Sequence, residues 1–387
     1  MNAARDATAA ETVAMLRESI ERYTGEHYAF EQRWSALRSA RAYSEKAWSD
    51  YAEMGWLALC LPEEAGGISA DASATAPLME AVGARLLLEP ILTSAILCTG
   101  LLTKRASEAQ KAALFPRLAD GSLKLALAHQ ESLNARLESD ITCTVRDGIL
   151  NGTKQAVLHG DCADRFIVSA KDADGLVRLC LADANAAGMQ RRDFRLLDGR
   201  GAATLRFENV KAEALAGPRS PDADTLSDAT ALAETLDEAA TALCSEALGA
   251  ITALNATTTQ YLKIRKQFGK PIGANQALQH RMVEMYMLQQ EVRALSRAAQ
   301  EALSSSGVER ERIISGARAF TCGASRRVAT EAVQMHGGIG ISDELDVSHY
   351  YRRLMVIGTL FGNRELHLDR FNVACERSVT GGARGAL

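Results

Sequence analysis

The sequence predicts an α+β protein in which helices come first, strands follow, and a second set of helices ends the chain. Apolar residues recur at steps of three and four in the first third of the 387 residues, alternate in short segments in the middle, and then return to the helical spacing. Because the strands follow one another directly, the pattern does not fit repeated β-α-β units. We expect an N-terminal helical domain at 1–122, a middle antiparallel β domain at 123–225 and a C-terminal four-helix bundle at 226–387.

The first domain is predicted to be helical because four of its segments carry apolar residues at helical spacing. These segments are Ala9–Arg22, Ser44–Met54, Ser73–Leu87 and Ser107–Leu118. Leu61-Pro-Glu-Glu-Ala-Gly-Gly67 interrupts them, and its proline and paired glycines predict a turn.

The middle domain is predicted to be a small antiparallel sheet because its apolar segments have the length of strands and are separated by glycine turns. The segments are Leu123–His129, Asp140–Val145, Ala156–Leu158, Arg165–Ala170, Leu176–Ala182 and Ala203–Phe207. Asp147-Gly148 and Asn151-Gly152 bracket only two residues, which predicts tight hairpin turns. Gly217-Pro218 predicts the turn that ends the domain.

The last domain returns to helical periodicity, and its four predicted helices suggest a bundle. The segments are about Leu226–Tyr261, Asn275–Ser304, Val308–His336, and a shorter helix within Phe361–Cys375.

Composition excludes several classes of partner. The formal net charge is -4, which argues against nucleic acid or an anionic membrane as the main partner. No apolar run approaches the roughly 20 residues of a transmembrane helix, so no membrane insertion is expected. The N-terminus lacks the apolar core of a secretory signal. The eight cysteines form neither a Cys-x-x-Cys pair nor a zinc pattern, which favours a cytoplasmic protein without a metal site.

Two motifs in the last domain suggest a cofactor site. The first is Arg265-Lys-Gln-Phe-Gly-Lys-Pro-Ile-Gly273, in which Arg265 can bind a pyrophosphate and Phe268 can pack on a purine or flavin ring. The second is Gln334-Met-His-Gly-Gly-Ile-Gly340, whose glycines let a ligand approach the backbone. A predicted helix, and no strand, precedes these glycines, so they do not form a Rossmann motif. Each motif alone could simply end a helix. Together they predict a site for a long, anionic, partly aromatic cofactor.

The order of the domains and both motifs resemble the acyl-CoA dehydrogenase family of flavoproteins, over nearly the whole chain. Leu57–Gly67 resembles the family's N-terminal turn, and Gln334–Gly338 resembles its C-terminal FAD loop. Residues 265–269, with two glutamines downstream, resemble its FAD-contacting segment. Residues 158–161 and 360–363 are most similar to the small subunit of pimeloyl-CoA dehydrogenase and to subunits of bacterial steroid-side-chain acyl-CoA dehydrogenases.

The resemblance implies FAD as the cofactor and assigns the residues that contact it. They are Arg265, Gln267, Phe268, Gln276, Gln279, Gln334, Met335, Gly337 and Gly338, with the backbones of Ala128 and Leu158 at the isoalloxazine edge. In relatives the neighbouring subunit grips the adenine end, which implies a homo-oligomer or a heterotetramer with a second acyl-CoA dehydrogenase subunit. The other implied partners are an acyl-CoA substrate and an electron-transfer flavoprotein.

The implied reaction is α,β-dehydrogenation of a bulky, steroid-derived or dicarboxylic acyl-CoA thioester, in which a carboxylate in a dry pocket removes the α-proton. Most relatives carry a Glu at the position of Phe361, and Phe cannot accept a proton. A minority branch places its base on the helix before the first motif, where Glu238 lies within one residue of the matching position. Glu238 is therefore the predicted base, with Glu365 in reserve and Glu246 as a weaker candidate.

Two alternatives remain open on the sequence. The flavin-facing segments Leu127–Glu131, 138–140 and Ala156–Leu158 lack the family's Thr and Trp side chains. This chain could therefore be a non-catalytic or half-site subunit that completes the FAD site of another chain. A weaker alternative is an acyl-CoA oxidase on the same fold. His129 and His159 end two predicted strands and receive no catalytic role.

Overall fold

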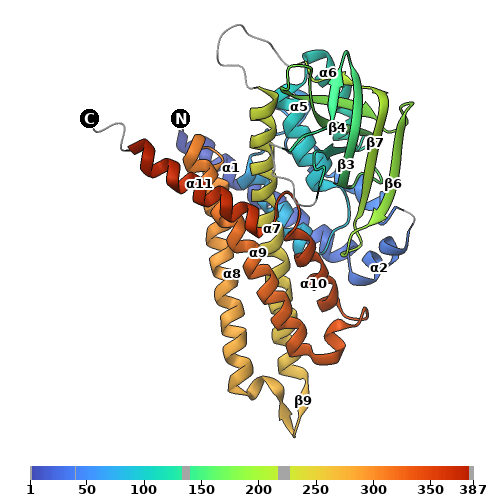
Figure 1. Ribbon diagram of the computed structural model, residues 1–387. Coiled ribbons are helices and arrows are strands. Elements are labelled where there is room, and N and C mark those ends of the chain that lie inside the picture. The colour runs from blue at the N-terminus through green and yellow to red at the C-terminus, as the bar shows by residue number, and fades with distance from the viewer. Residues whose placement is uncertain (1, 40, 133–139, 217–226, 383–387) are drawn as a thin grey trace. The chain divides into compact units, whose positions relative to one another are not determined.

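The computed structural model describes residues 2–39, 41–132, 140–216 and 227–382 (Figure 1). Contacts divide the chain into two compact units. The helical unit contains residues 1–34, 72–87 and 240–387, and the sheet unit contains residues 35–71 and 88–239. The predicted turn at Gly217-Pro218 and the first two residues of the 138–140 segment lie outside the described residues. The predicted domain boundaries at 122 and 225 stay predictions.

The predicted helices of the N-terminal part form, and additional ones lie between them. The predicted segments become α1 (Asn2–His27), α3 (Glu45–Glu53), α4 (Ala72–Ala84) and α6 (Glu108–Ala119), and the additional helices are α2 (Phe30–Arg38), η3 (Ile91–Cys98) and α5 (Thr99–Arg105). Ser44 caps α3 by accepting a hydrogen bond from the Ala47 amide, and Ser107 and Gln110 form a capping box at α6. All eight residues of η3, a π-helix, are buried, so its sequence lacks the two-faced periodicity that reveals a helix.

The sheet unit is built on one eight-stranded sheet, in which β6, β7, β3 and β4 can be followed in Figure 1. Its strands are β1 (Leu125–Ala128), β2 (Thr144–Arg146), β3 (Ile149–Leu158), β4 (Arg165–Lys171), β5 (Val177–Asp183), β6 (Met189–Arg195), β7 (Gly201–Lys211) and β8 (Glu213–Ala214). The order is β6-β7-β3-β2-β4-β5-β8, with β1 also beside β4.

The sheet differs from the prediction in several details. Asn151-Gly152 lies within β3 and forms no turn, and the short strand β8 was not predicted. β1 and β2 run parallel to β4, whereas the other pairs are antiparallel. Long connections between β1 or β2 and β4 permit this pairing, which local turn signals do not reveal. β6 was not predicted, because it is an edge strand whose residues are mostly exposed and charged and show no apolar alternation. The hydrophobic core of the sheet unit contains Leu150, Phe166, Val168 and Leu205, and all four side chains are fully buried.

The helical unit contains α1, α4, most of α7 (Asp228–Ile264), α8 (Gln276–Ala302), α9 (Gly307–His336), α10 (Asp346–Ile357) and α11 (Arg364–Gly382). The four predicted C-terminal helices correspond to α7, α8, α9 and α11, and the fold class is confirmed. The prediction missed α10, although Val347, Tyr350 and Leu354 recur at helical spacing and are buried. No helix in the described part of the chain is long and apolar enough to cross a membrane.

Two glycines let α4 and α7 cross with their backbones in contact. A Cβ atom at Gly83 would lie 1.8 Å from the carbonyl oxygen of Glu246, and one at Gly249 would lie 1.8 Å from the carbonyl oxygen of Glu80. Real Cβ atoms cannot approach a carbonyl oxygen so closely, so any side chain at either position would force the two helices apart. The crossing therefore requires glycine at both positions.

Gly249→Ala is expected to lower the free energy of unfolding by about 3 kcal/mol, because the added methyl group overpacks a contact between rigid backbones. Urea denaturation followed by circular dichroism measures this change. Gly25→Ala in α1 is the matched control, since a Cβ atom there meets nothing within 4 Å and alanine favours the helix. Equal stability of Gly249→Ala and the wild type would contradict the close crossing.

Candidate functional site

The two cofactor motifs meet at one end of the helical unit. α7 ends at Ile264, and the chain turns back through the short hairpin of β9 (Lys266–Gln267) and β10 (Lys270–Pro271) before η4 (Ile272–Ala274) and α8 (Figure 1). The ring of His336, the last residue of α9, stacks on Tyr261 of α7 with the centroids 4.3 Å apart. The Tyr261 hydroxyl also donates to the His336 carbonyl oxygen at 3.3 Å. The glycine loop after α9 therefore lies beside the end of α7.

The hairpin offers an exposed aromatic ring among cations. Phe268 is 100% exposed, and its φ of +53° is in the left-handed region that non-glycine residues rarely adopt. Arg265, Lys266 and Lys270 surround it in sequence and are also exposed. A strained backbone that presents a bare phenyl ring to solvent is typical of a binding surface.

The predicted glutamines lie next to the hairpin. Gln276 and Gln279 are exposed in the first turn of α8, and the Gln279 amide donates to the Gly273 carbonyl oxygen at 2.9 Å. Gln267 is exposed on β9 and donates to the carbonyl oxygen of Lys266 at 2.8 Å. All three side chains can reach a ligand at the surface of this end.

The glycine loop presents an open backbone. Gly337 has a φ of +65°, and a Cβ atom at Gly337 or Gly338 would meet nothing within 4 Å. Gln334 is exposed, whereas the side chain of Met335 is only 5% exposed, so Met335 can offer a ligand mainly its backbone. Cations, an aromatic ring and accessible peptide groups are the chemistry that binds an anionic nucleotide, and this end of the helical unit fits one.

The other predicted backbone contacts lie in the sheet unit. Ala128 ends β1 and pairs with Val168, and no strand in the described ranges pairs with the opposite edge of β1. Leu158 ends β3 and pairs with Ala202. Ala128 and Leu158 thus each pair with a strand on one side, because β2 pairs with β3 only at residues 149–151.

A buried lysine that the sequence reading did not single out fixes the chain just after β1. Lys154 of β3 is 0% exposed, and its ammonium donates to the His129 carbonyl oxygen at 2.9 Å, to Glu131 Oε1 at 2.7 Å and to Ser169 Oγ at 3.1 Å. Lys154 has the inward parity of Leu150 on the same strand, which is the signal that could have revealed a buried cation.

The Lys154 network controls the charge of Glu131. Burial alone works to raise the pKa of Glu131, but the Lys154 charge and hydrogen bonds from Lys154, the Thr142 hydroxyl and the Cys143 amide outweigh it and hold the pKa at about 2. Burial lowers the pKa of Lys154 below its usual range. Glu131 is thus a buried carboxylate whose charge is stabilised by Lys154 together with hydrogen bonds from Thr142 and Cys143.

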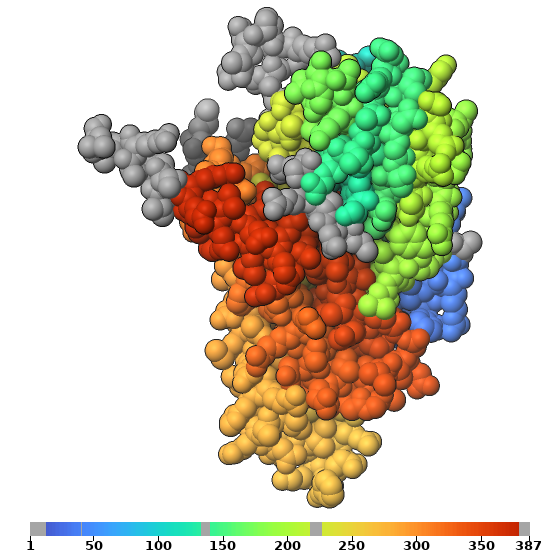
Figure 2. All heavy atoms as spheres, viewed as in Figure 1, coloured from blue at the N-terminus to red at the C-terminus, as the bar shows by residue number. Residues whose placement is uncertain are grey.

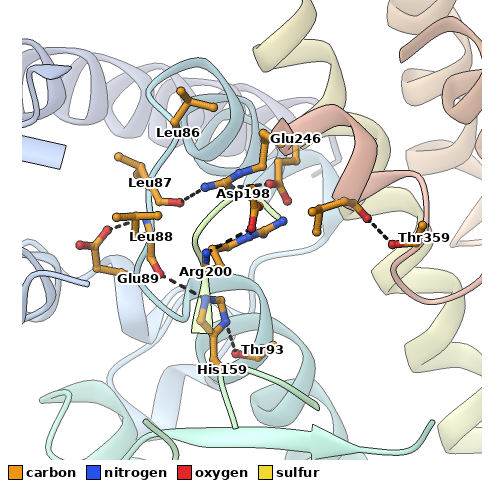
Figure 3. A network of polar contacts seen from close by, with 12 residues as sticks. Leu86, Leu87, Leu88, Glu89, Thr93, His159, Asp198, Arg200, Glu246 and Thr359 are labelled. Atoms are coloured by element: carbon orange, nitrogen blue, oxygen red, sulfur yellow. Dashed lines mark hydrogen bonds and ion pairs between the residues drawn. The ribbon is translucent and has the colours of Figure 1, made fainter. Parts of the chain in front are cut away.

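The two histidines at the strand ends have hydrogen-bonding partners in the sheet unit. His129 Nδ1 lies 2.9 Å from Ser169 Oγ. His159 is 3% exposed, and Figure 3 shows its ring between Leu88 and Thr93. Its Nε2 donates a hydrogen bond to the Leu88 carbonyl oxygen at 3.2 Å. Its Nδ1 lies 3.2 Å from the Thr93 hydroxyl and serves as the acceptor of the neutral ring.

The predicted base Glu238 is part of an ion pair in the sheet unit. Lys104 Nζ of α5 lies 2.6 Å from Glu238 Oε1 and 3.3 Å from Glu234 Oε2. The Glu238 side chain is 28% exposed. Its Oε2 faces Gly100, where an added Cβ atom would lie 3.3 Å away. One carboxylate oxygen is therefore bound to a cation and the other lies against a glycine, an arrangement that the sequence did not reveal.

The other candidate carboxylates have contrasting surroundings in the helical unit. Glu365 is 72% exposed in the first turn of α11. Glu246 is 0% exposed and pairs with Arg353 of α10 at 2.8 Å, while Arg353 also donates to the Leu87 carbonyl oxygen at 2.7 Å. Figure 3 draws both contacts, with Glu246 and Leu87 labelled. Glu246 therefore joins α7 to α10, and its charge is already matched.

Comparisons with known proteins identify the family. The family model described as the acyl-CoA dehydrogenase N-terminal domain matches residues 10–122, and that of the C-terminal domain matches residues 229–373. Acyl-CoA dehydrogenase IpdE2 of Mycobacterium tuberculosis is 29% identical over 340 residues, which cover 88% of this chain and 89% of that protein. The chain therefore belongs to the acyl-CoA dehydrogenase family.

Solved structures have the same fold. A variant of the Tcur3481-Tcur3483 steroid ACAD is similar with a TM-score of 0.87 and 25% identity, and the match covers 96% of this chain and 99% of the other. A chain of the ChsE4-ChsE5 complex from Mycobacterium tuberculosis is similar with a TM-score of 0.84 and 20% identity, covering 95% and 97%.

FAD is the cofactor of this family, and the open end of the helical unit fits its anionic, aromatic chemistry. The described residues contain no group of three or more His, Cys, Asp or Glu side chains placed to hold a metal ion.

Lys154→Met is expected to lower the free energy of unfolding by about 3 kcal/mol at pH 7, because it leaves the Glu131 carboxylate buried without its cation. Because the folded-state pKa of Glu131 is about 2 and its ordinary value is 4.5, the wild type loses this contribution as pH falls from 4.5 towards 2. The variant should lack that loss. Urea denaturation at several pH values measures both effects.

The controls for this prediction are two further variants. Lys111→Met removes an exposed lysine paired with Glu108 and should change stability by less than about 0.5 kcal/mol. Adding Glu131→Gln to Lys154→Met should restore part of the lost stability. If Lys154→Met and Lys111→Met were equally stable, the buried pair would have no such role.

Proposed function

We propose that this chain catalyses FAD-dependent α,β-dehydrogenation of an acyl-CoA thioester and passes the electrons to an electron-transfer flavoprotein. The observation that carries the proposal is the junction of the hairpin and the glycine loop through Tyr261 and His336, which gives one end of the helical unit the chemistry of a nucleotide site. A bulky, steroid-derived or dicarboxylic acyl group is part of the proposal, and the description of the Tcur3481-Tcur3483 relative as a steroid ACAD supports it.

In this proposal, the exposed end of the helical unit holds the nucleotide part of FAD. Arg265 supplies a cation for the pyrophosphate, Phe268 supplies a face for a ring, and Gly337 and Gly338 supply peptide groups. The residues that complete the set are Gln267, Gln276, Gln279, Gln334 and Met335, with the backbones of Ala128 and Leu158 for the isoalloxazine edge. FAD, when bound, supplies the acceptor for the hydrogen that leaves the β-carbon.

Glu238 is the proposed base for the α-proton. Its Oε1 is bound to Lys104, so Oε2 is the oxygen left to accept a proton. The ion pair fixes the carboxylate group, and a fixed carboxylate near the substrate can act as a general base.

The free cysteines, which include Cys98, Cys143 and Cys180 in the protein interior, fit a reducing cytoplasmic environment.

Glu238→Gln should leave FAD bound but slow the acyl-CoA-dependent bleaching of the flavin about a hundredfold or more, because the amide cannot accept the α-proton. Anaerobic stopped-flow absorbance in single-turnover conditions measures the rate. Glu234→Gln is the matched control, because Glu234 contacts the same Lys104 and lies one helical turn away. An unchanged rate in Glu238→Gln would exclude this base and make Glu365 the next residue to test.

A second candidate function is that of a partner subunit in a heteromeric dehydrogenase. Phe361 at the usual base position and the Lys104–Glu238 ion pair favour it, because both reduce the supply of a free base. One solved structure with the same fold is described as the ChsE4-ChsE5 complex. Exposed large apolar side chains on the helical unit support an assembly. They include Ile264, Phe268, Val283, Tyr286, Met287 and Ile341.

Ile264 and Phe268 belong to the end of α7 and the hairpin that carries the first cofactor motif, and Figure 2 draws this part of the chain in yellow and orange. Val283, Tyr286 and Met287 lie at steps of three and four on one face of α8 and are each more than half exposed. An assembly through this face would bring a second chain to the FAD site. A homo-oligomer and a heterotetramer both meet this requirement.

Expression alone and with an acyl-CoA dehydrogenase homologue encoded nearby should distinguish the two functions. The enzyme function predicts a yellow oligomer from this chain alone, whose flavin bleaches with acyl-CoA. The partner function predicts flavin only after co-expression. Size-exclusion chromatography with light scattering and visible absorbance measures mass and flavin content. Met287→Glu should reduce the oligomer in either case, and a monomer that retains full flavin would contradict an intersubunit site.

A further inference from the structure

The turn between α10 and α11 has an unusual backbone. Phe361 has a φ of +51°, and Gly362 follows it with a φ of +101°. A left-handed phenylalanine is rare and strained, so it persists only where its surroundings hold it. The contacts of residues 357–363 therefore determine where the side chain at position 361 can lie.

One holding group is a buried arginine of α9. Arg318 is 0% exposed, and its Nη2 donates to the carbonyl oxygens of Ile357 and of Leu360, the latter at 3.1 Å. No carboxylate forms an ion pair with Arg318 in the part of the chain that is described. Ile357 is the last residue of α10, so the cation faces the negative end of a helix whose final carbonyl groups need donors.

The second holding group is a buried histidine of α11. His367 is 0% exposed, and its Nε2 donates to the Phe361 carbonyl oxygen at 3.1 Å. Burial, with the charges of Arg318 and Arg370, lowers the pKa of His367 to about 3, so the ring is neutral near pH 7 and keeps one N–H for this bond. Gly362 packs on the same ring, because an added Cβ atom there would lie 2.8 Å from Nε2.

The start of α11 completes the turn. Asn363 Oδ1 accepts a hydrogen bond from the Leu366 amide at 2.9 Å, and the Asn363 carbonyl oxygen accepts one from the His367 amide at 3.2 Å. The side chain of residue 361 takes part in none of these contacts. The shape of the turn therefore depends on Arg318, His367 and Asn363, and not on which side chain occupies position 361.

We propose that Arg318 and His367 are positioning residues that hold the α10–α11 turn in its strained form and so fix the place of side chain 361. For its consequence in catalysis, this inference rests on the proposed function, because 361 is the position at which most relatives carry the base. It implies that the chain keeps the backbone of that position although a phenyl ring has replaced the carboxylate. A glutamate at 361 would then lie in a ready-made setting.

Hydrogen exchange of the full-length protein tests the hold on the turn without any assay of activity. The reporters are the amides of Thr359, Leu360 and His367, which all donate hydrogen bonds in this segment. Arg318→Met and His367→Leu should raise their exchange rates about tenfold or more, since each removes a buried donor from carbonyl groups. Arg318→Lys and His367→Gln keep a donor and should raise the rates much less.

Amides near the middle of α8 serve as the reference and should exchange as in the wild type. If Arg318→Met does not fold, the pair His367→Leu and His367→Gln carries the test. Unchanged exchange at the turn in His367→Leu, or an equal increase in His367→Gln, would overturn the proposal.

Anaerobic reduction assays on the flavin-loaded protein, with its partner chain if one is required, test the link to catalysis. In the Glu238→Gln background, Phe361→Glu should raise the bleaching rate by at least tenfold, and adding His367→Leu should remove that gain through kcat with little change in KM. If Arg318→Met and His367→Leu exchange faster at the turn but Phe361→Glu does not raise the bleaching rate, the role of Arg318 and His367 in holding the turn would be supported. The proposed catalytic site would then be contradicted. The two failures are therefore distinguishable.

Discussion

The helical unit depends on one stretch of α7, from Glu246 to Gly249, at which three helices meet. Gly249 brings the backbone of α7 against α4, and Gly83 does the same from the other side. Between these contacts, the buried Glu246–Arg353 pair joins α7 to α10, and Arg353 also bonds to the chain just after α4. Breaking a buried ion pair costs about 3–5 kcal/mol. The close crossing and the ion pair therefore together fix how α4, α7 and α10 pack against one another.

The packing of these helices also positions the cofactor motifs and the α10–α11 turn. α7 ends in the hairpin that carries Arg265 and Phe268, and its last turn holds the glycine loop through Tyr261 and His336. α10 begins after that loop and ends where Arg318 bonds to its last carbonyl group. Because these elements all pack on α7, the geometry of the site follows from packing deep in the unit.

Three positions with non-glycine side chains share a left-handed backbone and bear on the predicted site. Ala156, Phe268 and Phe361 all have left-handed backbones, with φ between +50° and +53°. By the resemblance to the family, Ala156 and Phe361 are expected to stand where relatives carry Trp and Glu. At Phe361, the buried His367 ring bonds to the carbonyl oxygen, so the backbone of this turn is held by a contact that does not involve the phenyl ring.

The sequence by itself determined the fold class, the places of most helices and strands, and the motifs that identify the family. These features are local, because helical and strand periodicity and turn glycines act over a few residues. Two elements were missed because their local signal is weak, since η3 is buried on all sides and β6 is an exposed edge strand with little apolar character. The helix α10 was missed although its apolar residues recur at helical spacing.

Only the tertiary structure decided which distant groups meet. It paired Glu238 with Lys104 and Glu246 with Arg353, placed β1 parallel to β4, and brought His336 to Tyr261. Each contact joins residues that are between 40 and 134 positions apart in the sequence. Periodicity carries no information over such separations, because burial and charge pairing are settled by the packing of whole elements.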